Sequence, residues 1–229
     1  YGASAAKALV QLKTDIESAI CSSQLPQTGT GSVGDMLGGL KHWTDPTATT
    51  GVFDTSAKQD FRSVTASRFD LSGGGSMGES DLRALVQAVY EAGGKSVGYT
   101  LFSGPAVVNE VTDYSRASGS VGGTVAGAAF NVDSDDAALR LSVTTWLSDY
   151  GRISIVPTLF AGRSSGVAIN ADVRNTGLLI PKDDSVSLKT LEGITTINLP
   201  DVGGGGKRGF ADWMGTVCVL NPRALGSIV

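Results

Sequence analysis

The sequence predicts a fold that mixes α-helices and β-strands, with long helices in the first half and most strands in the second. Apolar residues recur at helical spacing over residues 4–21 and 77–92. Beyond residue 141, short runs rich in β-branched residues alternate with turn residues. Of the 229 residues, 41% are hydrophobic and 17% are charged, so the chain can bury a core of ordinary size.

The first helix is expected over residues 4–21, where apolar and polar side chains fall on opposite sides. The apolar side consists of Ala5, Leu9, Leu12, Ile16 and Ala19, with Ile20 beside them. We expect Leu9 and Leu12 to be buried, so that alanine at either position costs about 2–5 kcal/mol by opening a core cavity.

The second long helix is expected from about residue 77 to residue 92. Ser76 and Glu79 have the S-x-x-E spacing of a capping box at its start. Its buried stripe is expected to be Leu82, Leu85, Val86 and Val89. Between the two helices, residues 22–76 are rich in Ser, Thr and Gly and are expected to be mostly loop. Such a long irregular stretch wraps over a surface or reaches a neighbouring molecule.

Strands are expected mainly after the second helix. A strand over 97–102 precedes a short helix that Ser103 is expected to cap, with Pro105 in its first turn. Residues 116–140 are Gly-rich, Ser-rich and then acidic, which predicts an exposed loop. A hairpin is expected around Asp149-Tyr150-Gly151. Further strands are expected at 166–173, 176–180, 194–199 and 215–220, with a final short helix near Pro222.

Charge, hydropathy and cysteine content argue against a nucleic-acid-binding protein, a membrane-spanning helix and a structural zinc site. A formal net charge of −4 without a basic stripe argues against gripping a nucleic-acid backbone. No run of about 18 apolar residues occurs, so no membrane-spanning helix is expected. Cys21 and Cys218 are expected to be two buried thiols, with a single disulfide as the alternative. With one histidine and no paired cysteine ligands, a structural zinc site is not expected.

Residues 73–78, "GGGSMG", match both a dinucleotide-binding turn and, through Ser76, the elbow of a serine hydrolase. The dinucleotide reading needs an acidic residue about 20 positions on, at the end of the next strand. That strand ends at Phe102-Ser103 without a carboxylate, and the segment before the turn is a weak strand. The glycines are therefore interpreted as a flexible lead-in to the capped helix.

The other motifs also lack parts that their chemistry requires. "GGKS" (93–96) closes a helix instead of opening one, and "GGGGKR" (203–208) has Arg208 where a phosphate-binding loop needs a hydroxyl. A second elbow match at Ser164 has no histidine after it, because the one histidine is His42. The acidic stretch 131–138 has Asp136 where a calcium loop needs glycine, so it is expected to be a solvated acidic loop, with loose cation binding as the alternative. We expect no catalytic residue, no cofactor site and no metal site.

Five stretches, in this order along the chain, resemble the major capsid (head) proteins of tailed bacteriophages. They are "AAKALVQLKTDIESAI" (5–20), "GDMLGGLKHWTD" (34–45), "LRALVQAVYEAGGKSVGYTLFSGPAVVNEVTDYS" (82–115), "WLSDYGRISIVPTLFAG" (146–162) and "VCVLNPRALGSI" (217–228). The resemblance implies an α+β fold. Its peripheral domain has a long spine helix and antiparallel strands, and its axial domain has a mixed sheet flanked by helices. The implied ranges are 1–76 for the first part of the peripheral domain, 77–185 for the axial domain and 186–229 for the closing peripheral strands.

The implied function is a viral structural protein, not an enzyme. It would self-assemble into pentamers and hexamers that form an icosahedral head shell around phage DNA. Its partners would be further copies of itself, with portal, scaffold or decoration proteins as further candidates, weak non-specific contact with packaged DNA, and no membrane. It would be assembled in the bacterial cytoplasm and reside in the virion.

Some features leave other readings open. In the family an arm and an extended loop precede the spine helix, whereas this sequence starts at that helix with Tyr1, so we expect it to have been trimmed. The β-rich second half also fits a secreted or tail-associated binding module. A serine hydrolase or a nucleotide-dependent enzyme using residues 73–78 is the weakest alternative.

Overall fold

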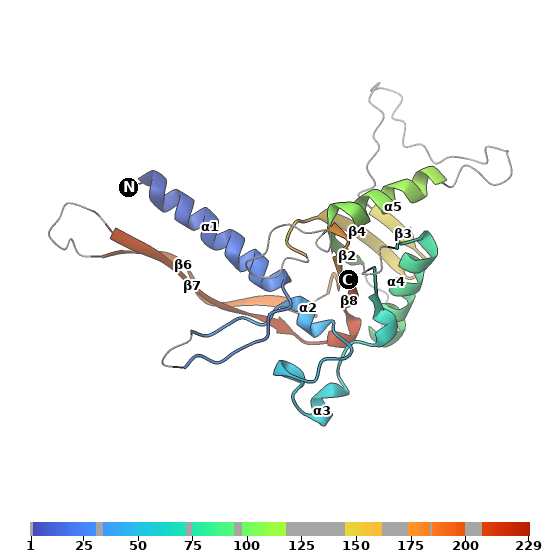
Figure 1. Cartoon of the computed structure of the whole chain (residues 1–229), viewed down its shortest axis with the longest axis horizontal. Helices are drawn as coiled ribbons and strands as arrows, with labels where there is room; N and C mark the ends of the chain where they lie inside the picture. The colour runs from blue at the N-terminus through green and yellow to red at the C-terminus, as the bar shows by residue number, and fades with distance from the viewer. Residues whose placement is uncertain are drawn as a thin grey trace, which may run out of the picture.

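The computed structural model describes residues 2–30, 34–71, 75–93, 98–117, 145–161, 174–183, 185–199 and 208–229. Within them, a six-stranded sheet and two helices form one body, and an arm extends from it (Figure 1). The arm consists of the helix α1 (Gly2–Cys21) beside a two-stranded ribbon of β6 (Val186–Leu199) and β7 (Arg208–Val219). The predicted α+β class is therefore confirmed.

The six-stranded sheet is mixed, in the order β1-β8-β5-β2-β4-β3. Its central strands are β5 (Gly177–Pro181), β2 (Tyr99–Ser103) and β4 (Gly151–Pro157), with β2 antiparallel to β5 and parallel to β4. One edge is β3 (Thr145–Ser148), which forms the predicted hairpin with β4. The other edge is formed by β8 (Gly226–Ile228) and β1 (Arg68–Phe69), which run parallel to each other.

Two helices cover one face of this sheet. The predicted buried stripe of α4 (Glu79–Gly93) is confirmed, because Leu82, Leu85, Val86 and Val89 are all buried. Val107 and Val111 of α5 (Pro105–Ala117) are buried in the same cluster. The strands contribute alternate residues to this cluster: Tyr99, Leu101, Ile153, Ile155, Leu179 and Ile228.

The base of the arm covers the opposite face. Leu178 of β5 is buried there with Leu40 and Val217, and Ile20, Phe102 and Val186 pack against them. Since residues 178 and 179 are neighbours on one strand, their side chains point to opposite faces. One sheet therefore joins the helical layer to the arm.

Both predicted serine caps are wrong. The amide of Gly78 donates to the carboxylate of Asp81 at 2.9 Å, so Asp81 serves the start of α4 and Ser76 is exposed. Ser103 is the last residue of β2, and its backbone carbonyl accepts from Thr158 at 2.9 Å. Ser103, which was predicted to cap the helix, is therefore still paired in the sheet, and α5 begins two residues later at Pro105.

The segment before α4 wraps over the surface with little regular structure, as predicted. It contains α2 (Leu40–Trp43), α3 (Ser56–Gln59) and the short 3-10 helices η1 (Gly51–Phe53) and η2 (Thr65–Ser67). Phe53 anchors it, with its ring centroid 5.7 Å from His42 and 5.6 Å from Trp43. The hydroxyl of Ser63 adds a buried hydrogen bond to the carbonyl of Leu225 at 3.0 Å.

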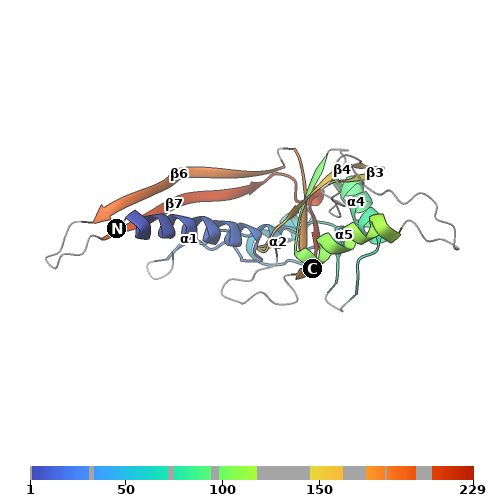
Figure 2. The ribbon, with the colours of Figure 1, turned by 90° about the horizontal axis from the view of Figure 1, so that it is seen from above.

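The expectation that Leu9 and Leu12 are core residues is wrong, since both side chains are only half-buried. Helix α1 lies along the ribbon and no layer of described residues covers its other side (Figure 2). A helix covered on one side keeps its apolar stripe partly exposed. The cost of alanine at either position is therefore expected to fall below the range for a core residue.

The other strand predictions divide into confirmed and untested ones. The strands at 176–180, 194–199 and 215–220 exist, and the last two are parts of longer strands. The short helix near Pro222 is the 3-10 helix η3 (Pro222–Ala224). Residues 118–144 and 162–173, with their predicted loop and strand, lie outside the described residues. The domain boundaries 1–76, 77–185 and 186–229 stay a prediction. β1 lies in the first range and β8 in the last, yet both belong to the same sheet as β2, β4 and β5 of the middle range.

Candidate functional site

The ribbon of β6 and β7 has two faces that differ in what covers them. Its antiparallel register runs from Val186↔Val219 at the base to Leu199↔Arg208 at the far end. In β7 the side chains alternate from residue 210 to residue 217, with the even positions exposed and the odd positions half-buried or buried. Because side chains alternate between faces along a strand, the odd positions form an inner face toward α1 and the even positions an outer face.

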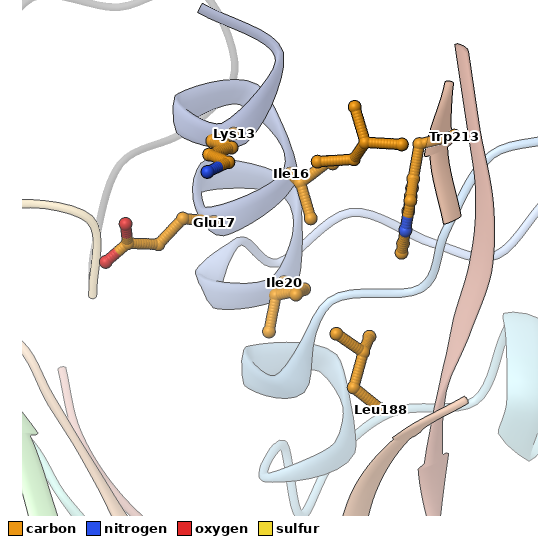
Figure 3. A pocket seen from close by; sticks show the side chains of 7 residues that line it. Lys13, Ile16, Glu17, Ile20, Leu188 and Trp213 are labelled. Atoms are coloured by element: carbon orange, nitrogen blue, oxygen red, sulfur yellow. The ribbon is translucent and has the colours of Figure 1, made fainter. Parts of the chain in front are cut away.

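The inner face and α1 enclose an open groove with a volume of about 240 Å³. Ile16 and Ile20 of α1 face Trp213 and Leu188 across it (Figure 3). The indole of Trp213 lies over Gly215, where a Cβ would come within 2.8 Å of the ring atom Cη2. Glycine at this position therefore lets the indole lie flat along the strand.

The groove can hold an apolar group but offers no catalytic chemistry. Its ionisable lining residues are Lys13 and Glu17, and the rest of its lining is Ile16, Ile20, Leu188, Ile194 and Trp213. None of these is a nucleophile paired with a base. The arrangement is suited to packing against side chains.

The outer face carries several exposed apolar side chains. Its far half carries the cross-strand pair Ile197–Phe210, each nearly half exposed, with Leu199 beside it. Met214 follows toward the base at 50% exposure, and Leu191, which has no partner residue on β7, reaches 83%. Apolar side chains gathered on one face in this way mark a contact surface on a soluble protein.

Two irregularities in β6 explain how these side chains are presented. The register shifts by one residue between Thr190 and Glu192, and again between Glu192 and Thr195. A bulge adds an unpaired residue and bends the strand. Leu191 is the extra residue at the first bulge, which accounts for its extreme exposure.

Sequence reasoning did not identify this surface. It expected strands at 194–199 and 215–220 but not continuous strands of 14 and 12 residues. Leu188, Leu191 and Ile194 are spaced by three because of the bulges, which hides the two-residue period of a strand. Residues 210–217 read F-A-D-W-M-G-T-V, which does not alternate apolar with polar types, so β7 gave no sequence signal for two different faces either.

The two cysteines are free thiols at the arm, and both are half-buried. Cys21 ends α1, and Cys218 pairs with Ser187 on the ribbon. Burial, followed by the nearby carboxylate of Glu17, raises the pKa of Cys21 to about 11. A thiol with so high a pKa is a poor nucleophile at neutral pH.

His42 is a packed residue. It is 5% exposed, and its ring lies against Phe53. Burial lowers the pKa of His42, and the carboxylate of Asp45 opposes that shift. Its Nε2 atom is buried without a hydrogen-bond partner among the described residues. No serine or cysteine side chain is hydrogen-bonded to it there.

The described part of the glycine motif, residues 75–78, leads into α4. The amide of Met77 donates to the carboxylate of Glu110 on α5 at 3.0 Å, and the amide of Gly78 donates to Asp81. A dinucleotide turn needs such amides free for a pyrophosphate. Here carboxylates of the chain itself take that place, and they would repel a phosphate.

Several predicted features lie outside the described residues. They are Ser164, most of the motifs at 93–96 and 203–208, and the acidic stretch at 131–138. In the parts of the chain that the structure describes, no group of three or more His, Cys, Asp or Glu side chains could hold a metal ion. The described helices include none that is long and apolar enough to cross a membrane.

Residues 2–229, nearly the whole chain, match the family model described as SU10 major capsid protein. A search of curated proteins found no match.

Proposed function

The chain belongs to the SU10 major capsid protein family, and from that premise we propose that its copies assemble into pentamers and hexamers forming an icosahedral phage head. Membership confirms the resemblance to phage capsid proteins and makes this a viral structural protein of the virion. The family is structural and not enzymatic. Assembly in the host cytoplasm and enclosure of DNA are parts of the proposal.

The observation that supports self-assembly best is the outer face of the ribbon. Ile197, Leu199, Phe210 and Met214 of this face, together with the unpaired Leu191, are exposed on an arm that extends from the body. Shell subunits need surfaces that are left uncovered in the monomer and become buried between copies. A net charge of −4 fits a shell whose contact with packaged DNA is weak and non-specific.

We further infer that the body of the six-stranded sheet corresponds to the axial domain and the arm to the peripheral domain. On this proposal the boundaries 1–76, 77–185 and 186–229 need one adjustment. The strands β1 and β8 from the outer ranges would belong to the axial sheet, because they pair within it. Portal, scaffold and decoration proteins remain candidate partners.

The assembly proposal is tested by light scattering on the purified protein, followed by negative-stain electron microscopy of any large species. Rings of five or six subunits, or closed shells, are the expected result. A protein that stays monomeric at all concentrations and binds a surface glycan would support a binding module in place of a shell subunit.

Segment 24–76 is proposed to contact a neighbouring subunit in the shell. Phe61 supports this, since its large apolar side chain is 65% exposed within this segment. Limited proteolysis is expected to cut this segment more slowly in assembled particles than in free subunits. Equal rates in the two states would place the segment away from the contacts.

A further inference from the structure

We propose that the outer face of the ribbon binds the same face of a second copy, antiparallel, about a two-fold axis through the Ile197–Phe210 pair. The inference rests on the proposed self-assembly and names one contact within it. Figure 2 shows α1 along one side of the ribbon only, so the described part of the chain leaves the outer side uncovered.

The register places the outer-face side chains in rows. From the far end these rows are Leu199 with Arg208, Ile197 with Phe210, and Thr195 with Asp212. The middle row is apolar on both strands, and each side chain in it is more than 40% exposed. When two sheets pack face to face, their backbones lie about 10 Å apart and such side chains come into contact between them.

The charges around this row are self-complementary. On β7, Arg208 lies two residues from Phe210 toward the far end, and Asp212 lies two residues from it toward the base. A two-fold axis that runs across the strands through the middle row turns one copy end for end. It therefore sets Arg208 of each copy opposite Asp212 of the other, while Ile197 meets Ile197 and Phe210 meets Phe210.

Both charged groups have capacity for this contact. Arg208 and Asp212 form no ion pair within the described residues. Asp212 accepts one hydrogen bond at its Oδ1 atom from the amide of Trp213 at 2.8 Å, which leaves Oδ2 for a guanidinium. A partner that matches this row needs an apolar centre with a carboxylate on one side and a guanidinium on the other. The chain itself has that pattern, which is the requirement for an isologous contact.

The size of the face indicates one contact among several. Turned end for end about the Ile197–Phe210 row, the two ribbons overlap among the described residues only from Thr195 to Leu199, so the shared face is roughly 16 Å long and about 10 Å wide, or roughly 160 Å². A stable free-standing complex buries about 800 Å² on each partner. We therefore expect this contact to link subunits that other surfaces also hold, as in a shell.

A charge exchange tests the pairing. Arg208→Asp or Asp212→Arg alone sets like charges opposite each other twice. Either variant is expected to raise the concentration needed for assembly roughly tenfold, measured by light scattering. The double variant with both changes restores opposite charges across the axis and is expected to return to the wild-type concentration. Lys189→Asp, on the same face but outside the paired rows, is the matched control and should change little.

Cross-linking tests the axis itself. In a background of Cys21→Ser and Cys218→Ser, Ile197→Cys places one thiol opposite its copy, within reach of a short bismaleimide. Thr216→Cys lies on the same face, six residues from Phe210, so its two copies would be separated by roughly 40 Å. A covalent dimer with Ile197→Cys but not with Thr216→Cys is expected in the assembled protein.

The outcomes separate this contact from the assembly proposal. If particles form and the double charge variant is no better than the single ones, or if both cysteine variants cross-link equally, the two-fold contact is wrong although assembly stands. If no particles form and Ile197→Cys gives no dimer at any concentration, both proposals fail. Melting temperatures equal to wild type confirm that each variant is folded.

Discussion

At the scale of single residues, Gly39 marks the closest approach between the end of α1 and the start of α2. Its amide donates to the carbonyl of Gln24 at 2.9 Å, and the amide of Lys41 donates to the carbonyl of Ser22 at 3.2 Å. A Cβ at Gly39 would overlap the Ser22 carbonyl group, with the carbonyl carbon at 2.6 Å. The position thus requires glycine because two backbone segments touch there.

Gly39→Ala is expected to destabilise the fold by about 1–3 kcal/mol, because two backbone segments must move apart. Thermal melting of the free subunit measures this as a lower midpoint. Gly34→Ala is the matched control, since no atom lies within 4 Å of a Cβ there. Equal midpoints for both variants would show that the contact between Gly39 and Ser22 relaxes without cost.

His42 makes the stability of the fold depend on pH. Burial lowers its pKa below the ordinary value of 6.5, so well above pH 6.5 the ring is neutral in both the folded and the unfolded chain. Below pH 6.5 the unfolded chain takes up the proton first, which favours unfolding. The loss of stability grows until the pH passes the lowered pKa of the folded state and is constant below it.

We expect His42→Phe to keep the ring packing against Phe53 while removing this titration. The melting temperature of wild type should therefore fall more steeply than that of the variant between pH 7 and pH 5. Parallel curves for the two proteins would mean that protonation of His42 does not contribute.

At the scale of elements, the two long helices differ in what covers them. The stripe of α4 is buried between the sheet and the segment before it, whereas α1 is covered by the ribbon on one side. Both helices have the same amphipathic pattern in sequence. The number of layers packed around a helix, and not its amphipathic pattern, sets how much each apolar side chain contributes to the stability of the fold.

Leu85→Ala in α4 is expected to cost about 2–5 kcal/mol, because the residue is 2% exposed and leaves a cavity. Leu9→Ala in α1 should cost less in the free subunit, since its side chain is half-buried. Denaturant unfolding compares the two variants under the same conditions. A larger loss of unfolding free energy for Leu9→Ala than for Leu85→Ala would contradict the partial exposure of Leu9.

At the scale of the whole molecule, one cluster connects the arm to the body. Leu40, Leu178 and Val217 bring α2, β5 and β7 together on the face of the sheet opposite α4 and α5. The far half of the ribbon lies beyond this cluster and depends on its own strand pairing and on α1. Local stability is therefore expected to fall along the arm with distance from the body.

Hydrogen exchange measures that gradient. Amides of β2 and α4 are expected to exchange most slowly in the free subunit, and amides at the far end of β6 and β7 fastest. Assembly should slow exchange at the far end of the ribbon, because its outer face becomes covered. An unchanged rate there in assembled particles would contradict the role of the ribbon as an interface.

The sequence alone determined the helices, several strands, the stripe of α4 and the capsid resemblance, because these depend on local periodicity and on the order of segments. It did not determine the serine caps, since strand pairing at Ser103 and the carboxylate of Asp81 decide where α5 and α4 begin. It did not reveal the outer face either, because the bulges at Leu191 and near Thr195 break the period of β6. Which side chains stay uncovered is set by layers that are distant in sequence, so only the tertiary structure decided where the candidate interface lies.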